Sequence, residues 1–159
     1  MAHIRTRLLL VAATVTSGIL AGTVVDRVLV GGPAWRALGA AAWADYSRHA
    51  DLGAGLVVYP VEAITAVLLM ISAAVSHHLD RNRSRAAMAP LLVGVVFSLF
   101  GLLLTVKAAP IMLALGEPLS RSAEQQAFIE FFFWGLYLRG VADVLTFLAA
   151  VWALHRLND

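Results

Sequence analysis

Cysteine is absent from the 159 residues of the chain, and charged residues make up only 14% of them. Without a thiol, the chain has no disulfide bond, no thiolate nucleophile and no cysteine-ligated iron–sulfur cluster. Quinone reductases that work through a membrane-embedded cysteine pair are excluded for the same reason. A soluble domain of this size needs far more polar surface than this composition supplies. We therefore interpret residues 1–159 as a single membrane domain.

A large excess of charge of one sign is also missing. The formal net charge is only +2 and the basic residues are scattered, so we expect no nucleic-acid partner. The sequence has no phosphate-binding loop, dinucleotide fingerprint, nucleophile elbow or haem attachment motif. His77 and His78 are adjacent, unlike the pair four residues apart on a zinc-binding helix. We expect no metal site, and the sequence leaves the cofactor open.

Long apolar runs are what the sequence has instead. They predict an all-α fold, an integral membrane four-helix bundle with spans at about 8–30, 55–78, 88–113 and 123–155. The basic start of the first run also fits a signal peptide, but its apolar character continues to Val30, so we expect a retained span. Ser122 and Gln125 match a capping box, which predicts that the last helix begins near Ala123.

The segment between the first two spans has a different pattern. Gly31, Gly32 and Pro33 predict a break after the first span. Aromatic and small apolar residues from Trp35 to Tyr46 then recur at helical spacing on one face, which is typical of a helix at the headgroup level. We expect an extracytoplasmic interfacial amphipathic helix at about 34–50. Asp26 and Arg27 would mark the far end of the first span, and Asp51 a solvated helix end.

The basic residues predict the orientation of the bundle. A cluster of arginines in the second connection weighs most, because positive charge concentrates in cytoplasmic loops. We expect both termini in the cytoplasm and a multi-pass protein of the cell membrane. The arginines on the expected cytoplasmic side are Arg5, Arg7, Arg81, Arg83, Arg85 and Arg156.

Ionisable residues inside the apolar runs point to a functional site. Arg139 and Asp143 are four residues apart in the last span, and Glu62 lies about two turns inside the second. Such residues normally face a bundle interior or a wet cavity. We predict a vestibule in the outer half of the bundle, with Glu62, Arg139 and Asp143 as catalytic groups. The residues expected to bind the substrate there are Tyr59, Lys107, Trp134, Tyr137, Trp35 and His49.

The layout of the chain also resembles a known group of small four-span membrane proteins. Gly18-Ile-Leu-Ala-Gly22, Pro33-Ala34-Trp35 and the last span with Trp134 and Arg139 carry the likeness to the anthrone-oxygenase-like group. The resemblance implies the oxidation of polycyclic aromatic polyketides without an obvious cofactor. No catalytic motif of the group can be matched residue by residue, so no role is carried over.

These observations favour a membrane-embedded enzyme, oxygenase- or isomerase-like, that acts on a lipophilic small molecule entering from the outer leaflet. They leave open whether it is an enzyme at all. One alternative is a non-enzymatic binding or proton-coupled transport protein. Another is a structural subunit, in which Arg139 pairs with Asp143 and Glu62 with Lys107 to fix the packing. Gly18 and Gly22 allow close helix approach and a possible homo-oligomer.

Overall fold

The computed structural model describes residues 2–80 and 84–157, with side chains from Ile4 onward. In this part of the chain all regular elements are helical, and four long helices are apolar enough to cross a membrane. The predictions of an all-α fold and of four helices of spanning length are thus confirmed. Arg81 and Arg83, on which the predicted orientation depends, lie outside the described residues. In chain order the elements, with η for a π-helical segment, are α1 (Ala2–Asp26), η1 (Arg27–Gly31), α2 (Gly32–Leu38), α3 (Ala40–His49), η2 (Ala50–Ala54), α4 (Gly55–Leu79), α5 (Arg85–Ala114), α6 (Arg121–Phe131), η3 (Phe132–Leu138) and α7 (Arg139–Arg156).

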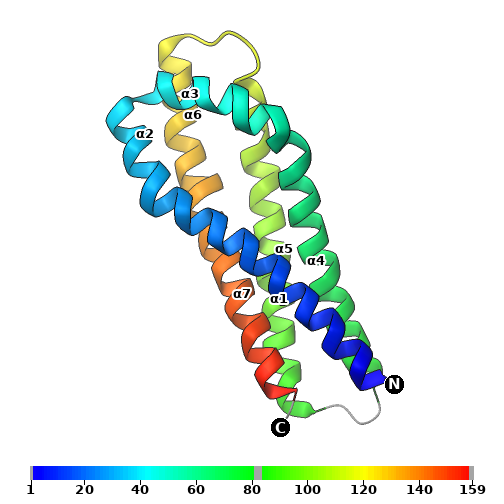
Figure 1. The fold of residues 1–159 in the computed structure, drawn as a ribbon. Coiled ribbons are helices and arrows are strands. Elements are labelled where there is room, and N and C mark those ends of the chain that lie inside the picture. Colours follow the sequence, from blue (N-terminus) through cyan, green and yellow to red (C-terminus); the bar gives the residue numbers. More distant parts are fainter. Residues whose placement is uncertain (1, 81–83, 158–159) are drawn as a thin grey trace.

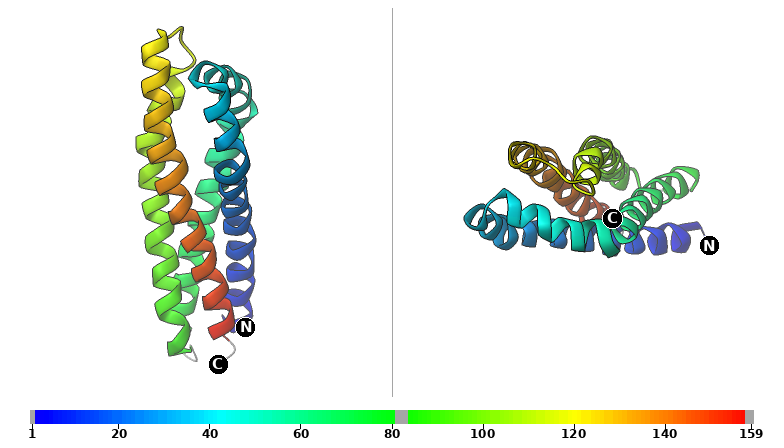
Figure 2. Two further views of the ribbon diagram at one scale, coloured as in Figure 1. Left: turned by 90° about the vertical axis from the view of Figure 1, so that its left-hand side faces the viewer. Right: turned by 90° about the horizontal axis from the view of Figure 1, so that it is seen from above.

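The long helices form an elongated bundle (Figure 1). Helix α1 packs against α4 and α7, and α5 packs against the same two helices. Helix α1 begins and α7 ends at one end of the bundle, which we call the terminal end. Helix α3 crosses the opposite end, which we call the roof end, as the two views of Figure 2 also show.

The predicted interfacial helix at 34–50 is divided in two. The chain continues as a helix through η1 and α2, so the break expected at Gly31–Pro33 is wrong. Pro33 lacks an N–H group and needs space for its ring. The preceding π-helical turn, in which the N–H of Gly32 donates to the oxygen of Arg27, accommodates it. The chain instead turns at Gly39, whose φ of 92° and ψ of 167° suit glycine almost alone.

The last long helix begins earlier than its capping box predicts. Ser120, rather than Ser122, is the N-cap: its side chain accepts a hydrogen bond from the N–H of Ala123, and α6 begins at Arg121. Glu124 is consequently in the first turn of α6 and is buried. Its carboxylate pairs with Arg48 of α3 at 2.7 Å, which ties the roof to α6.

Two apolar cores lie at opposite ends of the bundle. At the roof end, Trp43 of α3 is fully buried and packs against the rings of Phe128 and Phe131. At the terminal end, Leu10, Met70 and Leu91 are fully buried in a second cluster with small residues of α7. The ionisable residues predicted in the spans are in neither core. They gather between the two.

Candidate functional site: a cavity lined by all the long helices

A cavity of about 260 Å³ lies between the two cores, and each of the four long helices contributes to its wall. Most of the lining is apolar, supplied by residues such as Leu20, Met112, Phe131 and Leu136. Its size and lining suit a small lipophilic molecule with a few polar groups. The ionisable residues of the wall are Arg27, Asp51, Tyr59, Glu62, Arg139 and Asp143.

The mouth of the cavity is on the side of the bundle. Four lining residues are exposed at the surface: Thr23 of α1, Leu56 and Pro60 of α4, and Leu113 of α5. Above them the roof is closed, because Trp43, Ala44 and Ser47 of α3 are fully buried. The cavity is therefore reached between long helices and not through α3.

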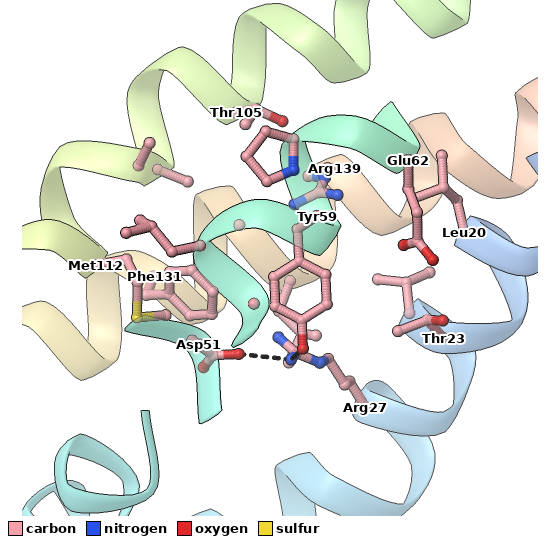
Figure 3. A pocket seen from close by; sticks show the side chains of 18 of the residues that line it. Leu20, Thr23, Arg27, Asp51, Tyr59, Glu62, Thr105, Met112, Phe131 and Arg139 are labelled. Atoms are coloured by element: carbon pink, nitrogen blue, oxygen red, sulfur yellow. Dashed lines mark hydrogen bonds and ion pairs between the residues drawn. The ribbon is translucent and has the colours of Figure 1, made fainter. Parts of the chain in front are cut away.

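Arg27, Asp51 and Tyr59 form a connected group at the roof end of the cavity. The Nη2 atom of Arg27 lies 2.7 Å from Oδ1 of Asp51 and 2.5 Å from the hydroxyl oxygen of Tyr59 (Figure 3). Gly55 makes this possible: a Cβ there would lie 2.5 Å from Cε2 of Tyr59 and 2.9 Å from the oxygen of Ala50. The guanidinium thus joins η1 and α4 and stays beside the Tyr59 ring, 4.9 Å from its centroid.

The second oxygen of Asp51 has no such partner. Asp51 is 5% exposed, and its Oδ2 atom is buried without a hydrogen bond in the described structure. Two more buried atoms share this property, Nε1 of Trp43 and Oγ of Ser47. The three residues follow one another at intervals of four on α3 and η2. Of the three, only Asp51 belongs to the cavity lining, and its buried Oδ2 is an acceptor that lacks a donor there.

Arg139 and Asp143 form a second pair deeper in the cavity. Nε of Arg139 lies 3.5 Å from Oδ2 of Asp143, a looser contact than that of Arg27 with Asp51. The two side chains are 21% and 13% exposed. Gly101 of α5 leaves the space for the carboxylate, because a Cβ there would lie 3.2 Å from Oδ1 of Asp143.

A smaller cavity of about 20 Å³ lies next to this pair and shares Arg139 and Asp143 with the larger one. A site of this size accommodates one water molecule. Hydroxyl groups line it, and four of them donate to carbonyl oxygens of their own helix, which leaves their lone pairs available. These hydroxyls belong to Ser17, Ser98, Thr105 and Thr146.

Glu62 contributes a carboxylate that is not part of either pair. It is half-buried, lines the cavity, and forms no ion pair or hydrogen bond within the described structure. Figure 3 shows its carboxylate beside Leu20 and Thr23 of α1, apart from the Arg27–Asp51 pair. The alternative in which Glu62 pairs with Lys107 is therefore wrong.

Every π-helical segment in the described part of the chain borders the cavity. Arg27 begins η1, Asp51 lies in η2, and Gly135 of η3 lines the wall just before Arg139. A π-helical turn holds one residue more than an α-helical turn, which rotates the side chains that follow by about 100°. Such turns are frequent at functional sites. Their coincidence at one cavity is a structural reason to regard it as the site.

The cavity brings together four of the residues that the sequence singles out. Tyr59, Glu62, Arg139 and Asp143 all line it. Of these, Tyr59 touches Arg27 and Asp143 touches Arg139, whereas Glu62 contacts neither arginine within 4.0 Å. Their roles in catalysis or binding remain predictions.

The other predicted binding residues lie away from the cavity lining. Lys107 is exposed and sits 6.0 Å from the ring centroid of Trp134. Tyr137 forms a hydrogen bond with Arg36, and Trp35 packs 5.5 Å from Tyr46, between ring centroids. His49 is exposed and hydrogen-bonds to Asp45 in the same helix.

Arg27 and Asp51 are the site residues that sequence reasoning missed. The sequence pattern places each of them at the end of an element, where a charge is usually solvated. A signal was present for Arg27, because the apolar run resumes after it with Val28, Leu29 and Val30. For Asp51 the sequence offers only its position directly before the second span.

The ligand chemistry of the site follows from these groups. No cluster of three or more His, Asp, Glu or Cys residues suited to a metal ion occurs among the described residues. The charged groups that can meet a ligand are carboxylates and guanidinium groups, which serve proton transfer and charge stabilisation. Comparison of the chain with models of protein families, with curated proteins and with solved structures finds no match.

Proposed function

We propose that the chain is an integral membrane protein of the cell membrane that binds a lipophilic small molecule in the cavity and acts on it by acid–base chemistry. One observation carries the proposal: charged side chains from the first, second and last long helices converge on an apolar cavity, to which α5 adds uncharged residues. Ionisable groups within spans are costly and normally serve a function. The sideways mouth would open to the lipid, so the ligand would enter from the outer leaflet.

In this proposal the carboxylate of Asp143 or Glu62 takes a proton from the ligand. Arg139 stabilises the negative charge that develops on an oxygen of the ligand. Return of the proton to a different carbon would complete an isomerase-like reaction without a co-substrate, whereas an oxygenase-like reaction would also consume dioxygen. The resemblance to the anthrone-oxygenase-like group stays a prediction and contributes no residue to this scheme.

The packing at the terminal end bears on the alternative of transport. A transporter needs a passage to both sides of the membrane, but Leu10, Met70 and Leu91 are fully buried between the cavity and that end. A site that is closed toward the terminal end favours binding or chemistry. The structural-subunit alternative predicts no ligand at all, which an experiment can decide.

The test is to purify the full chain in lipid nanodiscs, extract it, and identify by mass spectrometry what is enriched over empty nanodiscs. We expect a lipophilic compound in the wild type and its loss in Ala109→Phe, because Ala109 lines the cavity and a ring there fills it. Ala114→Phe makes the same change at an exposed position of α5 outside the lining, and should retain the compound. Equal retention in both variants, each folded, would refute the proposed cavity.

A further inference from the structure

The charges in the cavity wall do not balance. Its lining includes two arginines and three carboxylates. Arg27 is paired with Asp51, and Arg139 contacts Asp143, so both guanidinium groups already have a carboxylate. Glu62 is left over, and no Lys or Arg side chain forms an ion pair with it in the described structure. An ionised carboxylate in a largely apolar wall is costly without a cationic partner.

Asp51 provides a second, independent indication that the cavity favours a ligand with a hydrogen-bond donor or a positive charge. Asp51 lines the cavity, and its Oδ2 atom is buried without a donor, although Oδ1 is held by Arg27. A buried acceptor without a partner costs free energy that a ligand donor recovers. Glu62 therefore offers an acceptor to the ligand, and Asp51 keeps an acceptor without a donor beside the same cavity.

From these two observations we infer that the cavity binds a lipophilic cation, whose protonated amine pairs with Glu62 while its apolar body lies against the cavity wall. The inference rests on the proposed function and names its substrate class. An anionic ligand would add to an existing excess of negative charge, whereas a cation removes it. The position of Glu62 agrees, since it lies with Thr23 at the exposed mouth, where a charged group enters last.

With this assignment, ligand binding and proton transfer fall to different residues, although the sequence predicts Glu62, Arg139 and Asp143 together as catalytic groups. Glu62 becomes the group that binds the ligand, and Asp143 with Arg139 remains for proton transfer deeper in the cavity. Apolar residues further inside, among them Met112, Phe131 and Leu136, would contact the body of the ligand. The amine can belong to a small molecule or to the headgroup of an aminolipid, since both present the same ammonium group.

The test uses three probes with the same tail, dodecylamine, dodecanol and dodecanoate. Each is titrated against the full chain in phosphatidylcholine nanodiscs, and its affinity is obtained from the rise in the thermal unfolding midpoint. We expect the amine to bind more tightly than the carboxylate. Glu62→Gln should weaken the amine at least tenfold, about 1.4 kcal/mol, and leave the alcohol unchanged.

Glu117→Gln is the matched control, because Glu117 is exposed in the turn after α5 and outside the cavity lining. It should bind the amine like the wild type, which separates the cavity from general attraction of amines to the protein surface. Nanodiscs that also contain phosphatidylethanolamine distinguish the source, since an aminolipid in the cavity would lower the apparent affinity for dodecylamine there.

Two results would overturn the inference while the proposed function stands. One is a carboxylate probe that binds as tightly as the amine; the other is a folded Glu62→Gln variant with unchanged affinity for the amine. If no probe binds at all, whatever its head group, the lipophile-binding cavity itself is refuted and the inference falls with it.

Discussion

Arg27 and Asp51 lie near opposite ends of the segment that joins α1 to α4. Their side chains form an ion pair, with Nη2 of Arg27 2.7 Å from Oδ1 of Asp51. Both are largely buried, with side-chain exposures of 17% and 4%. A buried pair is not strong evidence for stability, but the loss of one partner leaves the other charge without compensation. Their main effect on the molecule is to hold η1 against η2 above the cavity.

A double-mutant cycle on this pair gives the first prediction at this scale. Arg27→Gln and Asp51→Asn should each lower the free energy of unfolding by about 3 kcal/mol or more, since each leaves a buried charge unpaired. The double variant should cost clearly less than the sum of the two. Unfolding in mixed micelles with increasing denaturing detergent measures all four proteins. Additive losses would contradict a direct interaction.

The residues of the site that sequence reasoning found are those whose charge is conspicuous. Glu62, Arg139 and Asp143 interrupt apolar runs, and such residues are known to face the interior of a bundle. Arg27 directly follows α1 and Asp51 lies shortly before α4, and a charge is ordinary at such positions. Their contact depends on how η1 and η2 rotate the two side chains, and no local pattern encodes that rotation.

At the scale of the elements, the turn at Gly39 determines where the roof lies. Gly39 is the single glycine with positive φ in the described part of the chain, and it separates α2 from α3. The helices themselves were predictable, because long apolar runs have few other solutions in a membrane. The break was not, since Gly31-Gly32-Pro33 carries stronger breaking signals than Gly39 and is absorbed by a π-helical turn.

Gly39→Ala is the prediction that belongs to this scale. The observed φ and ψ are strained for a residue with a Cβ, so we expect a loss of about 1 to 3 kcal/mol in the free energy of unfolding. Gly22→Ala is the control, because Gly22 lies inside the continuous helix of α1 and η1, and nothing lies within 4 Å of its Cβ position. It should gain about 0.5 to 1 kcal/mol from its helical propensity.

The control also bears on the predicted oligomer. Gly18 is already used inside the bundle, because a Cβ there would lie 3.1 Å from the ring of Phe147, whereas Gly22 is exposed. Loss of stability in Gly22→Ala, together with loss of a dimer on size-exclusion chromatography, would place a second copy of the chain at this face. Equal losses in Gly39→Ala and Gly22→Ala without a dimer would contradict the role assigned to Gly39.

At the scale of the whole molecule, the roof and the terminal end are opposite ends of one bundle (Figure 1). If these four helices cross a membrane, the roof end and the terminal end must therefore lie on opposite sides of it. The assignment of the terminal end to the cytoplasm comes from the arginine distribution and remains a prediction.

The absence of cysteine makes this orientation easy to measure. Glu117→Cys places the only thiol of the chain in the exposed turn at the roof end, and Ala86→Cys places it in the exposed first turn of α5 at the terminal end. We expect a membrane-impermeant maleimide to label Glu117→Cys on intact cells and Ala86→Cys only after permeabilisation. The opposite pattern would invert the orientation, and labelling of both on intact cells would contradict four crossings.

The closed core at the terminal end has a kinetic consequence. In the proposed function, the fully buried Leu10, Met70 and Leu91 close the terminal end, so the product would leave by the side of the bundle through which the starting compound enters. Product and substrate would then exclude each other from a common passage. Inhibition by product should be purely competitive. A gradient of solute across the membrane would not change the direction of the reaction.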